Sequence, residues 1–479
     1  MAKSIVVYIW AMMSKISTQV IQLFFMLLLA RYISPADFGT IGVLSIFITI
    51  SNVLIDSGMS ASLIKEKDIT TDDCSSLFTF NISVSVLLYC IIYICSPLIE
   101  HYFHIETLAR VCKLIAIPII INAISIVPKT LLVKRLKFNI IFWVQFISML
   151  LSCVITAVFV VVYEWKLDAL ILYYNLSAIF PSVGYVLWMK YIPRFKIKKQ
   201  SIQKLFGFGF FNTMSNIVDT IYENILSIFI GKYLNVAQVG YYSQAKRLEE
   251  VPSKSITDLI CGTSFPLLCT NNEDKDWYIR KIIQIQHVLY SIMIPIMMLI
   301  MIYAKDIIRL VLGENWAQAS PYLILLAFAG IWVIIENTNR TFIKSLGRAD
   351  IMFWASIFKR ALGIIIIILA LLLSPAYLLY AYIIASMIAA LINAYALSTL
   401  IPYPLMQQLK LWLQSLVPAC IFYIISIILY NSINSYCALI PLTGIAIILY
   451  IAMLPLFGIT DIRELLKELL LMVTSAIKC

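Results

Sequence analysis

Fourteen stretches of this chain are apolar and long enough to cross a lipid bilayer as a helix, which takes about 20 apolar residues. They cover residues 5–30, 39–60, 77–99, 108–129, 139–162, 168–190, 204–231, 236–268, 279–303, 318–344, 351–373, 376–400, 411–430 and 436–457. Hydrophobic residues make up 62% of the chain and charged residues 13%, whereas charged residues supply about a quarter of a soluble domain. We therefore predict an all-α membrane protein with about 14 transmembrane helices and no separate soluble catalytic domain.

The membrane pattern also occurs twice. Residues 31–39 read Arg-Tyr-Ile-Ser-Pro-Ala-Asp-Phe-Gly, and residues 232–240, which lie 201 positions later, read Lys-Tyr-Leu-Asn-Val-Ala-Gln-Val-Gly. A second echo follows in the same order, because residues 130–143 (TLLVKRLKFNIIFW) resemble residues 341–354 (TFIKSLGRADIMFW), 211 positions later. Two echoes with nearly equal offsets predict two copies of one unit of roughly 200 residues. Chance similarity between apolar stretches is the alternative.

The repeat predicts how the chain is divided. Residues 1–203 would form an N-terminal lobe with spans 1–6, and residues 204–405 a pseudo-symmetric C-terminal lobe with spans 7–12. Residues 406–479 would add two further spans and an amphipathic tail over 461–478, which lies at the membrane surface. Repeated halves with a polar path at their interface are typical of transporters.

Lysines and arginines predict the orientation in the membrane. With the N-terminus in the cytoplasm, 22 of the 36 fall in cytoplasmic segments, 7 on the opposite side and the remaining 7 inside spans. Because positive residues concentrate on the cytoplasmic side, both termini are predicted to be cytoplasmic. The most basic loop, residues 190–204, is expected to link the lobes and to lie on anionic headgroups.

Motifs for metal, cofactor or nucleotide chemistry are missing from the sequence. The ten cysteines are scattered without a C-x-x-C spacing, and there is no Gly-rich phosphate loop ending in Lys-Ser/Thr. His101 and His104 lie three residues apart, but an exposed loop explains them better than a metal site. We expect no metal, no cofactor, no nucleic-acid partner and no enzymatic activity.

Ionisable residues at membrane depth are the candidate functional groups, because they are costly there. The expected cavity cations are Lys15, Lys246, Arg247, Arg340, Lys359 and Arg360. The expected ion-coupling acids are Asp56, Asp219, Glu223 and Glu336. Six charged residues lie inside the eighth stretch, 236–268, and a helix can carry them only where it faces a water-filled cavity.

Two interpretations of these charges compete. Internal salt bridges could hold the helices together, with Glu336 paired to Arg340 and either Glu249 or Glu250 paired to a lysine of the same helix. Alternatively, the excess of cations could face a cavity and bind an anionic headgroup through its phosphates. For the set as a whole we favour the second interpretation. Asp219 and Glu223 lie one turn apart, and such a pair can hold a proton or a sodium ion.

The stretch around the first repeat turn resembles a known family. Ala30-Arg31-Tyr32-Ile33-Ser34-Pro35-Ala36-Asp37-Phe38-Gly39 is similar to the turn after the first span of bacterial polysaccharide transporters, the Wzx-type flippases of lipid-linked oligosaccharides. Asp56-Ser57-Gly58 and the segment from Lys232 to Tyr242 match further family features. The resemblance runs through about residue 400. These transporters belong to the multidrug/oligosaccharidyl-lipid/polysaccharide exporter superfamily, and the chain most resembles their colanic-acid-exporter-like branch.

The resemblance implies a function and partners. It implies two six-helix lobes and alternating access of an undecaprenyl-pyrophosphate-linked oligosaccharide from the cytoplasmic to the outer face of the bacterial inner membrane. Expected partners are that lipid, membrane lipids, H⁺ or Na⁺, and a polysaccharide polymerase, and the protein is expected to be a monomer. Two alternatives stay open: a cation-coupled multidrug exporter of the same superfamily, and a membrane glycosyltransferase or polymerase.

Overall fold

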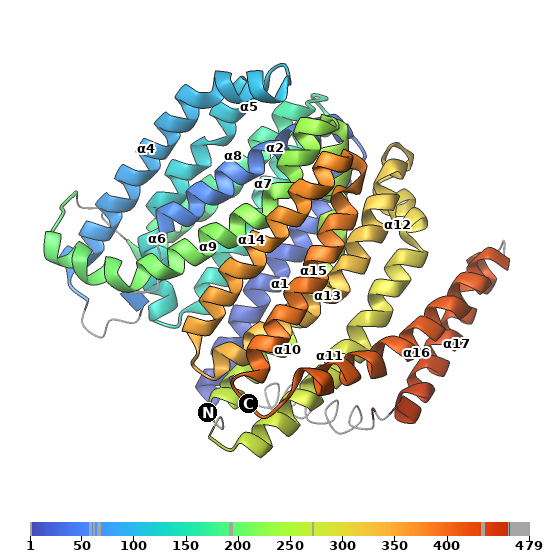
Figure 1. Ribbon diagram of the computed structural model, residues 1–479. Helices are drawn as coiled ribbons and strands as arrows, with labels where there is room; N and C mark the ends of the chain where they lie inside the picture. Colours follow the sequence, from blue (N-terminus) through green and yellow to red (C-terminus); the bar gives the residue numbers. More distant parts are fainter. Residues whose placement is uncertain are drawn as a thin grey trace. The chain divides into compact units, whose positions relative to one another are not determined.

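The computed structural model describes residues 2–56, 60, 63–64, 69–190, 195–270, 273–432, 436–457 and 459. Helices account for nearly all of these residues, and no strand occurs among them (Figure 1). Such a bundle suits a bilayer, because a helix satisfies its backbone hydrogen bonds within its own segment. The all-α fold predicted from the sequence is confirmed. The amphipathic tail expected over residues 461–478 lies outside the described residues.

The helices follow the predicted apolar stretches closely. In the first half they are α1 (Ala2–Ala30), α2 (Pro35–Asp56), α4 (Thr71–Phe103), α5 (Leu108–Ile115), α6 (Ile117–Lys134), α7 (Phe138–Val161), α8 (Leu167–Met189) and α9 (Lys199–Tyr233). In the second half they are α10 (Val236–Thr270), α11 (Lys275–Ile302), α12 (Ala304–Val311), α13 (Ser320–Ser345), α14 (Ala349–Leu373), α15 (Leu378–Ser398), α16 (Leu405–Ser432) and α17 (Tyr436–Met453). Short 3₁₀ turns, Glu314–Ala319, Pro375–Tyr377 and Leu454–Phe457, precede α13 and α15 and follow α17.

Ten helical segments of the described chain are long and apolar enough to cross a membrane. These are Pro35–Asp56, Thr71–Phe103, Leu108–Lys134, Phe138–Val161, Leu167–Met189, Lys275–Ile302, Glu314–Ser345, Asp350–Leu373, Pro375–Ser398 and Leu405–Ser432. The chain is therefore a multi-pass membrane protein. The finer count of 14 spans stays a prediction.

Local sequence explains several helix boundaries. Thr70 caps α4: its hydroxyl accepts a hydrogen bond from the Asp73 amide at 3.2 Å, and the Asp73 carboxylate accepts one from the Thr70 amide at 3.1 Å. The single stretch expected over 108–129 is divided into α5 and α6 at Ala116. Pro118 stands in the first turn of α6, where its missing amide donor costs nothing.

The chain divides into two compact units, Met1–Ser243 and Gln244–Cys479, and the division falls within α10. In the first unit, α1 packs on α7, α8 packs on both α6 and α7, and α9 packs on α2 and α4. In the second unit, α15 packs on α13 and α14, while α11 packs on α13 and α16. The lobe boundary expected at residues 203–204 lies in the first turns of α9.

The two repeat turns meet inside the first unit. A Cβ atom at Gly39 in α2 would overlap the carbonyl oxygen of Val236, the first residue of α10. A Cβ atom at Gly240 in α10 would overlap the carbonyl oxygen of Pro35, the first residue of α2. The two helix starts therefore cross at a backbone-to-backbone distance that only glycine permits.

The core of the second unit also contains a polar network. The side-chain amide of Gln286 in α11 donates to Asn339 in α13 at 3.0 Å and accepts from the Tyr403 hydroxyl at 3.1 Å. Gln408 in α16 donates to the carbonyl oxygens of Ala394 and Tyr403 at 3.0 and 3.2 Å. The network fixes α11, α13 and α16 against one another, because a buried amide without partners would be costly.

Candidate functional site

A cluster of buried charges lies in the second unit, around Glu336 of α13. The Lys359 ammonium lies 2.7 Å from the Glu336 carboxylate, and both side chains are almost completely buried, at 1% and 3% exposed. The Arg360 guanidinium lies 3.4 Å from the same carboxylate oxygen. Two neighbouring cations of α14 therefore share one acid of α13. Such a pair is retained only where its geometry offsets the large cost of removing both charges from water.

Asn393 of α15 holds this cluster in place. Its amide nitrogen donates to the backbone carbonyl of Glu336 at 3.1 Å, and its amide oxygen accepts from Lys359 at 3.4 Å. Asn393 is 2% exposed. It is a functional candidate that the sequence analysis missed. Its position in the middle of the 376–400 stretch, where an amide is costly, was the signal that could have found it.

Arg340 lies one helical turn after Glu336 and interacts electrostatically with it. The expected Glu336–Arg340 pairing is thus only part of the arrangement, because Lys359 and Arg360 make the close contacts. The four named groups comprise three cations and one carboxylate. An arrangement with this excess of positive charge can hold an anion through charge-assisted hydrogen bonds.

A second charged group follows α10. The Glu250 carboxylate lies 2.9 Å from the Lys254 ammonium and 3.9 Å from that of Lys246, so the three form an i, i+4 ladder along the helix. Lys246 and Glu250 are half-buried, whereas Lys254 is exposed. This is the internal pairing that the sequence analysis offered as an alternative. Arg247, which directly follows Lys246 in α10, is half-buried.

Glu249 of α10 is 8% exposed and lies against Gly330 of α13. A Cβ atom at position 330 would overlap its carboxylate. The absence of a side chain at Gly330 therefore makes room for an acid between two helices of the second unit.

The expected acids of the first unit are spread over two helices. Asp56 ends α2, is exposed, and accepts a short hydrogen bond from the Ser60 hydroxyl. Asp219 is half-buried and Glu223 is exposed, one turn apart on α9. Lys15 lies in α1, and its side chain is outside the described residues.

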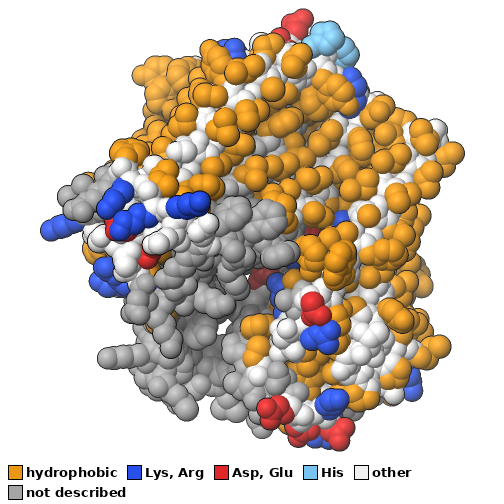
Figure 2. Space-filling view, turned by 60° about the vertical axis from the view of Figure 1, so that its left-hand side comes forward, with side chains coloured by type: hydrophobic (Ala, Val, Ile, Leu, Met, Phe, Trp, Pro, Cys, Tyr) orange, Lys and Arg blue, Asp and Glu red, His pale blue; other side chains and the backbone are white. Residues whose placement is uncertain are grey.

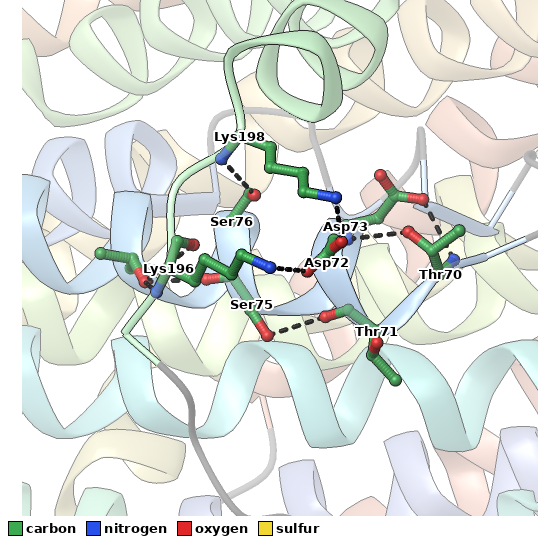
Figure 3. A network of polar contacts seen from close by, with 9 residues as sticks. Thr70, Thr71, Asp72, Asp73, Ser75, Ser76, Lys196 and Lys198 are labelled. Atoms are coloured by element: carbon green, nitrogen blue, oxygen red, sulfur yellow. Dashed lines mark hydrogen bonds and ion pairs between the residues drawn. The ribbon is translucent and has the colours of Figure 1, made fainter.

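The basic linker between α8 and α9 is attached to the start of α4 (Figure 3). Asp72 forms ion pairs with Lys196, at 2.9 Å, and with Lys198. The linker backbone is held as well, because the amide of Lys196 donates to the Thr79 hydroxyl at 3.1 Å and that of Lys198 donates to the Ser76 hydroxyl at 2.9 Å. These two lysines, expected on lipid headgroups, thus have protein partners.

Apolar side chains cover most of the face seen in Figure 2, and charged side chains gather in a few places on it. Large exposed apolar side chains include Leu372 and Leu373 of α14, at 78% and 80% exposed. In water such a surface would aggregate, whereas in a bilayer it is solvated by lipid.

Apolar helices in two units, with charges buried among them, define a multi-pass membrane protein. Solved structures agree on the fold. The lipid II flippase MurJ in an inward closed conformation aligns over 96% of this chain and 100% of its own, with a TM-score of 0.73 and 17% identity. An inward-facing multidrug resistance transporter of the MATE family aligns over 81% of this chain and 95% of its own, with a TM-score of 0.64 and 12% identity.

Sequence comparison adds the family. Residues 28–321 match the model of a family described as polysaccharide biosynthesis protein, and the chain belongs to that family. It is 26% identical to the teichuronic acid biosynthesis protein TuaB of Bacillus subtilis (strain 168), over 72% of each chain. It is 24% identical to the lipopolysaccharide biosynthesis protein WzxC of Escherichia coli (strain K12), over 71% of this chain and 69% of that protein. The succinoglycan biosynthesis transport protein ExoT of Rhizobium meliloti (strain 1021) is 22% identical over 73% of this chain and 71% of its own length.

Proposed function

We propose that the chain is a flippase, which moves an undecaprenyl-pyrophosphate-linked oligosaccharide across the bacterial cytoplasmic membrane for the assembly of a surface polysaccharide. The family match and the relatives in polysaccharide biosynthesis support the pathway, and the fold shared with a lipid II flippase supports the transport of a lipid-linked sugar. The transport would proceed by alternating access of two six-helix lobes, 1–203 and 204–405, with residues 406–479 as an addition.

The observation that carries the proposal is the cation excess around Glu336. Lys359 and Arg360 share the Glu336 carboxylate, and Arg340 lies one turn further along α13. A lipid-linked pyrophosphate carries negative charge, and Arg binds phosphate oxygens with a planar fork of N–H donors. The same cation excess disfavours a multidrug exporter of cationic compounds. We propose Lys246 and Arg247 of the second unit as further contacts of the lipid-linked substrate, and Lys15 as a candidate contact within the first unit.

Arg340 offers the cleaner test of this site, because Lys359 also stabilises the fold through Glu336. A charge-assisted hydrogen bond contributes about 1.5–3 kcal/mol, which is about tenfold to a hundredfold in binding. We expect Arg340→Gln to lower polysaccharide export by about that factor at unchanged protein level, with Arg340→Lys in between. Export is measured in a strain that lacks its own flippase and expresses the variants. Wild-type export by Arg340→Gln would refute the anion site.

Energy coupling is a separate part of the proposal. Asp219 and Glu223 lie one turn apart on one face of α9. We propose that this pair carries H⁺ or Na⁺, with Asp56 and Glu336 as further candidates. Transport into vesicles with and without an imposed gradient tests the role, in the wild type and in Asp219→Asn/Glu223→Gln. Gradient-independent flipping by the wild type would exclude it.

A further inference from the structure

One face of α2 carries polar groups through the membrane-spanning part of the helix. Ser45, Thr49, Asn52 and Asp56 are separated by four, three and four positions, so they lie in one row along the helix. We call this row the α2 track. Ser45 and Asp56 are eleven steps apart, and at about 1.5 Å per step the ends of the track lie about 16 Å apart, roughly half of the 30 Å hydrocarbon core.

The α2 track is open, whereas other faces of α2 are packed. Thr49 and Asp56 are exposed, and Ser45 and Asn52 are half-buried. Leu44 and Ile55, on other faces of the same helix, are 0% and 1% exposed. An exposed carboxylate on a membrane helix faces water and not lipid, because its transfer into hydrocarbon is costly. The Asp56 end of the track is therefore in contact with water, and the exposed Thr49 lies two turns before it on the same face of the helix.

Polar side chains of two neighbouring helices lie alongside the track. Asn122 of α6 donates its amide N–H to the Asn52 amide oxygen at 3.3 Å. Asn224 of α9 accepts from the Ser45 hydroxyl at 3.4 Å. Lys129 is exposed and lies two turns after Asn122 on α6, where it interacts electrostatically with the Asp56 carboxylate. Most of the polar groups along the track are thus hydroxyls and amides. The one cation named here, Lys129, faces the carboxylate of Asp56.

The chemistry of the α2 track matches a carbohydrate. Hydroxyl and amide groups both donate and accept hydrogen bonds, as sugar hydroxyls do, whereas a pyrophosphate requires an excess of cations. We propose that the α2 track binds the saccharide part of the lipid-linked substrate. This inference rests on the proposed flippase function. It deepens that function, because it assigns the sugar to a row of two hydroxyl groups, one amide and one carboxylate along α2.

The experiment compares two lipids on the purified full chain in lipid nanodiscs. One probe is undecaprenyl pyrophosphate without sugar. The other is the undecaprenyl-pyrophosphate-linked oligosaccharide extracted from the producing bacterium. We expect Thr49→Val, which keeps the side-chain shape and removes the hydroxyl, to weaken binding of the sugar-bearing lipid about fivefold. Binding of undecaprenyl pyrophosphate should stay the same. Thr49→Ser, which restores a hydroxyl, should bind as the wild type does.

A matched control lies on another helix. Ser83 of α4 is exposed and donates its hydroxyl to the carbonyl of the residue four positions earlier, as Thr49 does to Ser45. Ser83→Ala should therefore leave both affinities unchanged. The double variant Thr49→Val/Asn52→Leu should lower the affinity for the sugar-bearing lipid by more than Thr49→Val alone does.

The outcomes separate the two proposals. Suppose that the wild type binds both lipids. If Thr49→Val then lowers the affinity for neither lipid, or lowers both affinities equally, the proposed saccharide binding by the α2 track is wrong and the flippase function stands. If the wild type binds neither lipid, both proposals are wrong. If the double variant unfolds, Thr49→Val and Thr49→Ser decide the question, since each changes a single exposed side chain.

Discussion

Gly39 and Gly240 hold equivalent places in the two copies of the repeat, and each lies against the backbone carbonyl that begins the other's helix. The contact is reciprocal: Gly39 meets Val236, and Gly240 meets Pro35, whose own positions in the repeat correspond. The two similar turns therefore form a reciprocal contact between the starts of α2 and α10. This contact explains why a glycine closes both copies of the turn.

Added side chains at this contact should destabilise the protein. Gly39→Ala and Gly240→Ala each place a Cβ atom on a backbone carbonyl, which cannot rotate away as a flexible side chain can. We expect each to lower the free energy of unfolding by about 1–3 kcal/mol, as overpacking does. Thermal unfolding in detergent measures the loss. Gly444→Ala, in α17, is the control, because no atom lies within 4 Å of a Cβ there. Equal unfolding temperatures for all three variants would contradict the close crossing.

The charge cluster predicts an order of stabilities. Glu336→Gln leaves Lys359 and Arg360 buried without their shared acid, and breaking a buried pair in this way costs about 3–5 kcal/mol. Lys359→Met should cost less, because Arg360 still faces Glu336. The double variant Glu336→Gln/Lys359→Met should lose less free energy of unfolding than the sum of the two single variants, because the two side chains interact. Unfolding temperatures and expression levels provide the comparison, and an additive double variant would argue against the pairing.

The linker should become more accessible when Asp72 is neutralised. Asp72→Asn removes both ion pairs to Lys196 and Lys198 but leaves the hydrogen bonds that the linker amides donate to the Thr79 and Ser76 hydroxyls. Exposed pairs are worth about 0–1 kcal/mol, so global stability should hardly change. Trypsin should nevertheless cleave after these lysines faster than in the wild type. Asp350→Asn, which removes an exposed pair with Arg348, serves as the control. Unchanged cleavage would mean that the backbone bonds alone hold the linker.

The predicted orientation can be checked with single cysteines in a cysteine-free background. A cysteine at Asn431, at the exposed end of α16, should react with a membrane-impermeant reagent added to intact cells. Cysteines at Lys198 and Lys467 should react only after the membrane is opened, because the positive residues place these segments in the cytoplasm. Labelling at position 198 in intact cells would overturn the topology.

Sequence reasoning located the helices because membrane insertion depends on length and hydropathy, which are local properties. The stretches expected over 139–162 and 168–190, for example, became α7 and α8. It could not choose the partner of Glu336. Spacing along one helix favoured Arg340, whereas the closest cation is Lys359, 23 positions away on the next helix. That choice depends on how α13 and α14 pack, which a single sequence does not contain. For the same reason, the repeat revealed Gly39 and Gly240 but not that they touch.

The buried pair between α13 and α14 also constrains how the chain is made. Lys359 and Arg360 stand near the middle of α14, and each cation there opposes insertion of a lone helix by about 2.5–3.5 kcal/mol. Their acid, Glu336, is on the helix synthesised just before, with only a short turn between. Insertion of α13 and α14 together, as a helical hairpin, would therefore cost less than insertion of α14 alone. In such a hairpin the Glu336 carboxylate offsets part of the positive charge of Lys359 and Arg360.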